Sequence, residues 1–212
     1  GGPEGFAEDR HVAHYRARAA GGVGLVIVEA ACVLPEGRLH IPQLGLWSDG
    51  HIPGLARIAA ACRAEGARTL LQVHHAGRHS VPDPANPEEP VLGPSDWSHG
   101  RRRARAASAE ELAAIGEAFV AAARRAFDAG FDGVELHGAH GYLLNQVASP
   151  IANRRTDGYG GDTRGRTRLL REIVAGIRSG TSPDFLVGCR MGGLDPDLDE
   201  GVRIARAYAE AG

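Results

Sequence analysis

Lysine is absent from this chain, in which all 24 basic residues are arginines. A Schiff-base or lysine-nucleophile mechanism is therefore excluded for it. Cysteine is scarce, and Cys32, Cys62 and Cys189 show no CxxC spacing. That pattern argues against a disulfide framework and against a zinc or iron–sulfur site. We therefore expect a reducing, cytoplasmic location.

Long apolar runs and strong net charge are also missing. No run approaches the roughly 18 residues that a membrane-spanning helix needs, and no signal peptide is visible. The formal net charge is only -2, so attraction to nucleic acid or to an anionic membrane is not expected. These absences leave a small molecule as the expected partner.

Apolar patterning divides the chain into alternating helices and strands. Short apolar runs predict strands over 24–30, 67–73, 131–137 and 184–191, and the first of these has the continuous apolar character of a strand buried on both faces. Helical spacing predicts helices over 9–20, 51–65, 108–129, 164–178 and 199–212. Ser108 begins the third of these with a capping-box pattern. The segments 34–50, 75–107 and 138–163 are predicted loops.

This alternation requires parallel strands with right-handed crossovers, as in a doubly wound sheet or a (β/α)8 barrel. No GxGxxG follows the first strand, which weakens the doubly wound alternative. Gln72, His137 and Arg190 each lie at or near the carboxyl end of a different strand, where barrel active sites are built. We therefore expect residues 1–212 to form one partial TIM-barrel domain, about four parallel strands that do not close. A strand before residue 9 and about three after residue 212 would be missing.

The segment VELHGAHGYLLNQ concentrates polar groups at the end of the third strand. His137 and His140 suit a metal ion, but such a pair needs further ligands, of which Glu135 is the nearest candidate. They can also simply cap the strand. A third possibility is a pair of hydrogen-bond donors for a developing oxyanion, with Tyr142 as proton donor.

The third possibility requires a hydride source for a reduction, and a cofactor must supply it. The Gln72 amide can both donate and accept hydrogen bonds, which suits the edge of a flavin or pyrimidine ring. Arg190 places a positive charge where a reduced, anionic ring would need one. Alone, Gln72 can equally be a satisfied core residue, and Arg190 can be part of an ion pair.

Several motifs resemble the Old Yellow Enzyme family of FMN-dependent ene-reductases, in particular its thermophilic-like branch. They are VEAACVLPEGR, LGLWSDGHI, LLQVHHAGRHS, GFDGVELHGAHGYLLNQVASPIANRRTDGYGG and FLVGCR. The resemblance covers nearly the whole chain, and GAHGYLLNQ followed by SPxxNxRTDxYGG is its most specific part.

The resemblance implies FMN as cofactor and NADPH or NADH as reductant. It implies that Ala30, Gln72 and Arg190 contact the flavin, and that His137 and His140 hold a carbonyl, nitro or phenol oxygen. Tyr142 would protonate the carbon opposite hydride delivery from flavin N5 to an activated alkene. It implies no catalytic metal, and we expect the full-length parent to be a homo-oligomer. With two sheet edges open, this chain alone should bind FMN weakly or not at all.

Other functions remain open at this point. A dienoyl-CoA reductase or amine dehydrogenase of the same family would add an iron–sulfur cluster and further domains. A non-catalytic half-barrel that assembles with a partner, and a metal-dependent barrel hydrolase, belong to other classes. The segment 153–161 is expected to form a structural loop network. For Arg101 to Arg105 we expect a solvated loop face, with contact to a cofactor phosphate or to a partner as the alternative. His74 is expected to point outward from the barrel, without a role.

Overall fold

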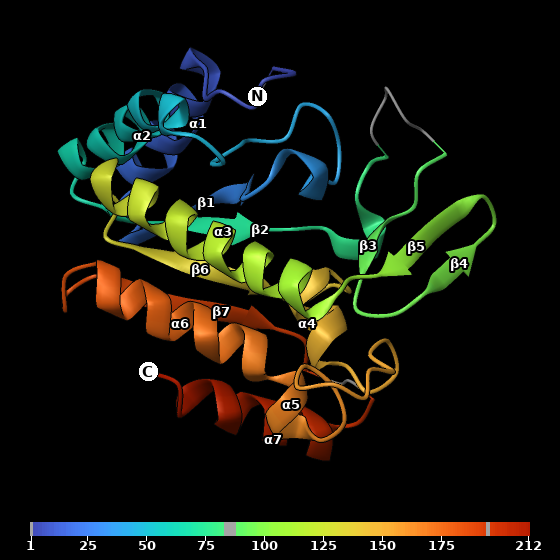
Figure 1. Cartoon of the computed structure of the whole chain (residues 1–212). Coiled ribbons are helices and arrows are strands. Elements are labelled where there is room, and N and C mark those ends of the chain that lie inside the picture. Colours follow the sequence, from blue (N-terminus) through green and yellow to red (C-terminus); the bar gives the residue numbers. More distant parts are fainter. Residues whose placement is uncertain (1, 83–87, 194–195) are drawn as a thin grey trace.

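The protein is built on a parallel sheet of four strands, in the order β1-β2-β6-β7 (Figure 1). The computed structural model describes residues 2–82, 88–193 and 196–212. The strands are β1 Leu25–Cys32, β2 Arg68–His74, β6 Gly133–Gly138 and β7 Leu186–Met191. Within the described chain β1 and β7 are the two edges, so the sheet does not close. The fold is the expected partial TIM barrel.

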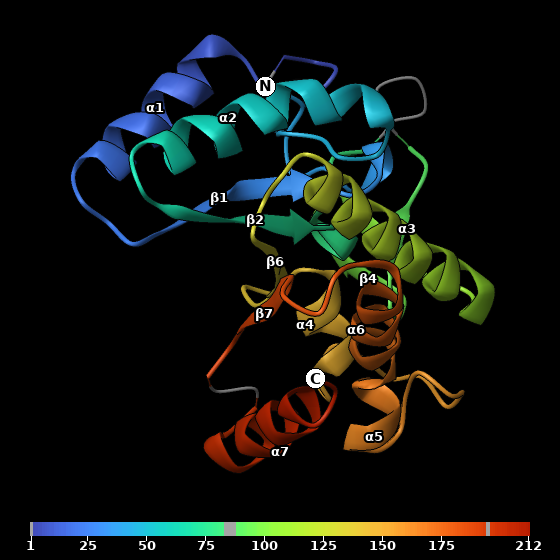
Figure 2. The same cartoon turned by 90° about the vertical axis from the view of Figure 1, so that its left-hand side faces the viewer.

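Five long helices lie along the outer side of this curved sheet (Figure 2). They are α1 Asp9–Ala20, α2 Ile52–Ala64, α3 Ala109–Asp128, α6 Arg168–Gly180 and α7 Leu198–Ala209. The core lies between helices and sheet, where Phe119, Leu71, Leu136 and Ile173 are fully buried. Apolar burial on this one face is the main stabilising contribution to the half-barrel.

The two edge strands are open on the inner face of the sheet, and the prediction that strand 24–30 is buried on both faces is wrong. Along β1, Val26 and Val28 face the helices and are buried, whereas Leu25 and Ile27 are 47% and 43% exposed. Leu186 on β7 is 53% exposed. A continuous apolar run normally indicates burial on both faces, but here no described element covers the inner face of β1 at Leu25 and Ile27.

The predicted strands and long helices are confirmed to within three residues at each end, apart from one helix. The expected helix 164–178 is divided into α5 Thr163–Arg166 and α6. The capping box of α3 is present: Ser108 Oγ accepts from the Glu111 N–H at 3.1 Å, and the Ser108 N–H donates to Glu111 Oε2 at 2.7 Å. No helix in the described parts of the chain has both the length and the apolar character that crossing a membrane requires.

Two predicted loops contain regular structure. Segment 75–107 holds a small sheet of β3 Val91–Gly93, β5 Arg102–Ala106 and β4 Trp97–His99, in that order. Its residues 83–87 lie outside the described chain. Segment 138–163 contains α4 Leu143–Ala148. Both were missed because these strands are short and carry arginines on exposed positions, and because the helix is too short to show a helical period.

The expected loop network at 153–161 is present. The buried Asn153 amide donates to the carbonyls of Val147 and Tyr159, at 2.6 and 2.7 Å. Arg155 Nε donates to Asp157 Oδ1 at 2.9 Å and Nη1 to the carbonyl of Pro94 at 3.1 Å. These bonds fix the chain between α4 and α5 and join it to the small sheet.

A second network joins the end of β2 to the start of α4. Gln146 Nε2 donates to the carbonyls of Ala76 and Gly141, at 3.1 and 2.5 Å, while its Oε1 accepts from the Arg78 N–H at 3.1 Å. Gly77 has φ +60°, and a Cβ there would collide with the Gln146 side chain. A glycine at this position therefore lets Gln146 hold the two chain segments together.

We predict that Gly77→Ala destabilises the protein more than Gly100→Ala. Both glycines have φ near +60°, but nothing lies within 4 Å of a Cβ at Gly100. Gly100→Ala should therefore cost only the left-handed strain of about 1–2 kcal/mol. Gly77→Ala should add about 1–3 kcal/mol for overpacking. Urea unfolding of both variants measures the difference, and equal losses would show that Gln146 does not depend on Gly77.

Candidate active site

The carboxyl ends of β2, β6 and β7 bring polar side chains to one edge of the sheet. In the register Gln72 lies opposite Glu135, and His137 lies opposite Arg190. Paired residues of neighbouring parallel strands point to the same side, and alternate residues of one strand share a side. The inner face therefore carries Gln72, Glu135, His137 and Arg190 together.

The turn after β6 adds His140 and Tyr142. His140 has φ +60° and is the only non-glycine residue in the described chain with a positive φ. Such a backbone costs energy and is found where surrounding structure enforces it. Gly141 donates to Asn145 Oδ1 at 2.8 Å, and Leu143 donates to the carbonyl of His75 at 3.0 Å. These bonds hold the turn against the end of β2.

The three predicted residues form one cluster. The ring centroid of His137 lies 5.1 Å from that of His140 and 4.9 Å from that of Tyr142, and His140 and Tyr142 are 6.3 Å apart. His137 is buried, Tyr142 is half-buried and His140 is exposed. The cluster thus reaches from the sheet to solvent, as a substrate site requires.

His74 belongs to this cluster, and the prediction that it points outward without contacts to the site is wrong. Its ring packs edge-on against Tyr142 at 4.6 Å and lies 5.3 Å from His137. It is 1% exposed, and neither ring nitrogen has a hydrogen-bond partner. Strand alternation could have shown this, because His74 is two residues beyond Gln72 and shares its face.

Burial keeps the inner imidazoles neutral. Burial, and then the charges of His137, His75 and His40, lower the pKa of His74 to about 3. Burial, with His140 and Arg190 nearby, lowers the pKa of His137 to about 4. His137 Nδ1 accepts from the Ala139 N–H at 3.4 Å. The neutral ring then carries its proton on Nε2, which is a donor for a ligand oxygen.

The residues expected to contact a cofactor lie at the same edge of the sheet. Gln72 Nε2 donates to Glu135 Oε2 at 2.5 Å. Arg190 is exposed and forms no ion pair with any described residue. Ala30 is half-buried on β1, where its carbonyl accepts from Gln43 Nε2 at 3.1 Å. Gln72 and Arg190 therefore flank the histidine cluster, while Ala30 lies on the far side of β2.

Acidic and thiol ligands are not gathered around the histidines. Across residues 2–82, 88–193 and 196–212, no group of three His, Cys, Asp or Glu side chains is placed to hold a metal ion. Glu135, the acid considered as a third ligand, is engaged by Gln72. The geometry therefore gives no support to a metal-dependent hydrolase.

Known proteins resemble this chain over most of its length. The NADH:flavin oxidoreductase / NADH oxidase family matches residues 2–207. An NADPH dehydrogenase of Halalkalibacterium halodurans is 46% identical over 170 residues, which are 80% of this chain and 49% of that protein. This chain thus spans about half the length of that curated relative.

Solved structures agree with the sequence relatives. A 2-naphthoyl-CoA reductase in complex with 2-naphthoyl-CoA has a TM-score of 0.90 at 30% identity, over 98% of this chain and 34% of that one. An Old Yellow Enzyme from Pichia sp. AKU4542 has a TM-score of 0.81 at 30% identity, over 89% of this chain and 52% of that one. The resemblance to Old Yellow Enzyme that the motifs indicated is confirmed, and the chain belongs to the NADH:flavin oxidoreductase / NADH oxidase family.

Proposed function

We propose that this site takes part in an FMN-dependent reduction of activated alkenes, such as enones, enals and nitroalkenes, with NADPH or NADH as reductant. The observation that carries the proposal is the cluster of His137, His140 and Tyr142, with ring centroids 4.9–6.3 Å apart at the mouth of the half-barrel. Two imidazoles beside one phenol are a donor set for a carbonyl or nitro oxygen with a proton source next to it.

The residues around the cluster fit a flavin ring. The exposed Arg190 guanidinium has no ion-pair partner among the described residues, and it would stabilise negative charge on the pyrimidine edge of a reduced ring. The Gln72 amide, on the other side of the histidine cluster, can donate and accept hydrogen bonds. Ala30 would contact the ring from β1. When bound, FMN would accept hydride from the nicotinamide and deliver it to the alkene.

His137 and His140 would bind the oxygen that activates the alkene. Neutral His137 presents Nε2–H, and His140 lies beside it with its backbone fixed in the left-handed region. As hydride reaches the β-carbon, charge builds on this oxygen, and donors already in place stabilise the transition state more than the ground state. Tyr142 would donate its phenolic proton to the α-carbon and recover a proton from solvent at its half-exposed position.

A second candidate is the reduction of an acyl-CoA thioester conjugated to a double bond. The likeness to 2-naphthoyl-CoA reductase favours it, with a TM-score of 0.90. A thioester carbonyl would use the same two histidines. Competition between cyclohexenone and an enoyl-CoA for the reduced protein separates the two candidates.

FMN binding tests the proposal first. We expect saturable binding when FMN is titrated into the chain and flavin absorbance is followed. Binding should be too weak to survive gel filtration, because the edge strands β1 and β7 have no neighbouring strand in the described chain. Arg190→Met should weaken it about tenfold, equivalent to ~1.4 kcal/mol, as expected for a charge-assisted contact. Arg164→Met, an exposed arginine on α5, is the control; equal effects of the two substitutions would contradict the assignment.

Tyr142→Phe should separate proton transfer from reduction of the flavin. With saturating FMN, we expect the rate with cyclohexenone to fall about 10²–10⁴-fold, the usual contribution of a positioned general acid. NADPH oxidation by dioxygen needs no proton delivered to carbon and should change less than about threefold. Tyr208→Phe, on α7, controls for loss of a phenol elsewhere. Equal losses with both acceptors would show that Tyr142 is not the proton donor.

The buried imidazoles should make the protein sensitive to acid. Below the ordinary histidine pKa of about 6.5, His74 and His137 bind protons in the unfolded chain but not in the folded protein. The free energy of unfolding should therefore fall as the pH drops from about 6.5 to about 4.

In His74→Phe we expect the loss between pH 7 and pH 5 to shrink by about 1–2 kcal/mol. Phe119→Leu should lower stability equally at every pH. Urea unfolding at several pH values decides, and an unchanged slope in His74→Phe would contradict a buried neutral imidazole.

A further inference from the structure

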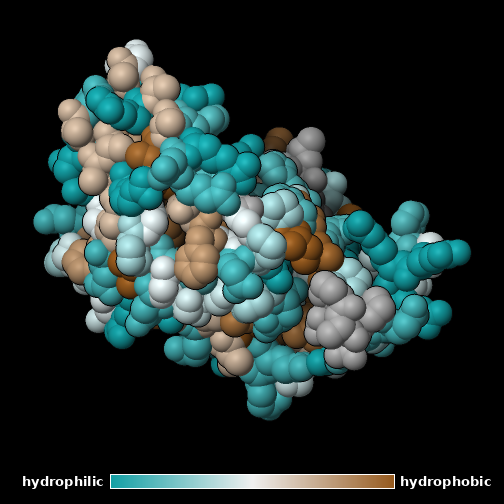
Figure 3. All heavy atoms as spheres, turned by 90° about the horizontal axis from the view of Figure 1, so that it is seen from above, coloured by the Kyte–Doolittle hydropathy of each residue, from teal (hydrophilic) through white to brown (hydrophobic). Residues whose placement is uncertain are grey.

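A cavity of about 240 Å³ lies between the turn that follows β1 and the small sheet, and none of its lining residues belongs to the histidine cluster. Half-buried side chains form its apolar wall, namely Val81, Val91 and Leu92. Seen from above, hydrophobic side chains reach the surface next to the hydrophilic projection at the right (Figure 3). Pockets for drug-sized ligands measure about 300–1,000 Å³, so this cavity suits a smaller molecule.

His75 is the buried polar group of the cavity lining. Its side chain is 2% exposed, and burial lowers its pKa to about 4, so the ring is neutral. Nδ1 accepts from the Gly77 N–H at 3.0 Å, which places the ring proton on Nε2. No described residue accepts from this Nε2–H. Buried donors normally have an acceptor, so His75 offers a hydrogen bond to a ligand in the cavity.

The position of the His75 ring is fixed from two sides. A Cβ at Gly37 would lie 2.4 Å from His75 Cδ2, so the ring packs directly against the backbone of this turn. The Ala76 N–H donates to the carbonyl of Gly37 at 2.7 Å and joins the turn to the end of β2. The donor is therefore held in place before any ligand binds, which lowers the entropic cost of binding.

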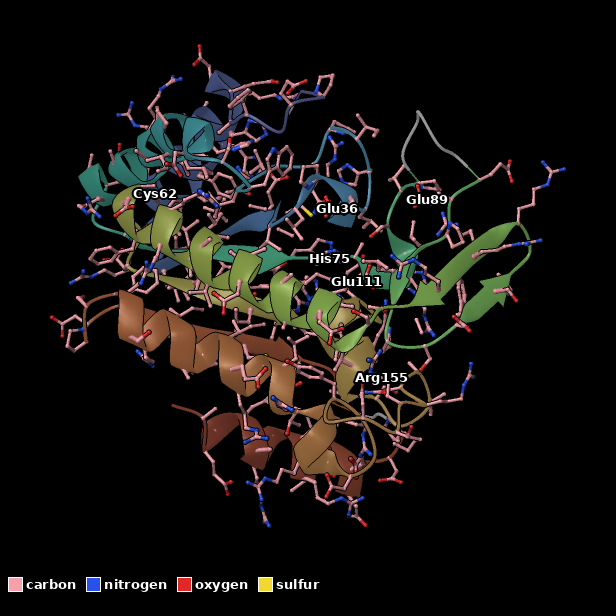
Figure 4. All side chains as sticks on the ribbon, in the orientation of Figure 1. Glu36, Cys62, His75, Glu89, Glu111 and Arg155 are labelled. Carbon is pink, nitrogen blue, oxygen red and sulfur yellow. The ribbon has the colours of Figure 1, made fainter. Side chains whose placement is uncertain are left out.

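Two carboxylates lie at the mouth of the cavity. Glu36, in the helical turn Pro35–Gly37, and Glu89, just before β3, are both exposed, and neither forms an ion pair with a described residue. Figure 4 labels both acids, with the label of His75 below theirs. Arg105 also lines the cavity, but it already donates to both oxygens of Glu111, at 2.8 and 2.6 Å. The mouth thus carries negative charge that attracts a cation.

We infer that this cavity binds a small aliphatic amine with a neutral oxygen at its far end, as in an amino alcohol. The ammonium group would lie between Glu36 and Glu89, and the hydroxyl oxygen would accept from His75 Nε2. The hydrocarbon between them would pack on the apolar wall. A carboxylate in place of the hydroxyl is disfavoured, because the two glutamates repel it. The inference goes beyond the proposed function and uses no residue assigned to the flavin or to the alkene.

An NMR titration of the full chain with 5-amino-1-pentanol, pentylamine and 1-pentanol tests the inference without any flavin. We expect the amino alcohol to bind at least about threefold more tightly than pentylamine, which lacks the acceptor for His75. It should bind at least about fivefold more tightly than 1-pentanol, which lacks the charge for the two glutamates. The Gly77 amide signal should shift on binding, because this N–H donates to His75.

Substitutions assign each preference to its residues. In His75→Phe, the amino alcohol and pentylamine should bind equally. In Glu36→Gln/Glu89→Gln, the advantage over 1-pentanol should be lost. Glu117→Gln/Glu210→Gln removes two exposed acids elsewhere and should keep both preferences. If His75→Phe does not fold, the two glutamine variants still decide.

Three results would overturn the inference. The first is equal binding of the amino alcohol and pentylamine by the unsubstituted chain. The second is an equal loss of the preference over 1-pentanol in the control Glu117→Gln/Glu210→Gln. The third is a preference for the hydroxyl that persists in folded His75→Phe.

Discussion

Parallel pairing of β1, β2, β6 and β7 is the constraint on which the rest of the structure depends. It aligns the carboxyl ends of the strands, so residues distant in sequence, such as Gln72, His137 and Arg190, meet at one edge. Hydrogen bonds from Gln146 and Leu143 then hold the His140–Tyr142 turn against the end of β2. Burial in the same place keeps His74 and His137 neutral. The pairing of the strands therefore determines both the positions of the site residues and the neutral state of His74 and His137.

Sequence patterning predicted the strands and long helices because the outer face of the sheet and the apolar faces of the helices are buried against one another. It also predicted the cluster of His137, His140 and Tyr142, because these residues lie close together in sequence at the end of one strand and in the turn that follows it. The roles of Ala30, Gln72 and Arg190 toward a flavin rest on the family resemblance and stay predictions. Their positions, at the carboxyl ends of three strands, are compatible with those roles.

What the sequence did not predict has physical reasons. The side of the sheet on which His74 lies was predicted wrongly. Gln72, two residues earlier on the same strand, points to the same side, and this relation was not used. The β4–β5 hairpin was missed since only Ala104 of β5 is buried, which leaves no alternating apolar signal. The exposure of Leu25 and Ile27 was not predicted, because a run of apolar residues indicates a strand with apolar neighbours on both faces. In the described chain no residues pack against these two side chains on the inner face.

The central claim is that His137 and His140 bind one oxygen while Tyr142 stands beside it. A crystal structure of the protein soaked with FMN and para-hydroxybenzaldehyde tests this directly, because the phenolic oxygen imitates the developing oxyanion. We predict that this oxygen lies within about 2.7–3.2 Å of a ring nitrogen of both histidines. A ligand bound through only one histidine, or bound elsewhere with the cluster empty, would contradict the account.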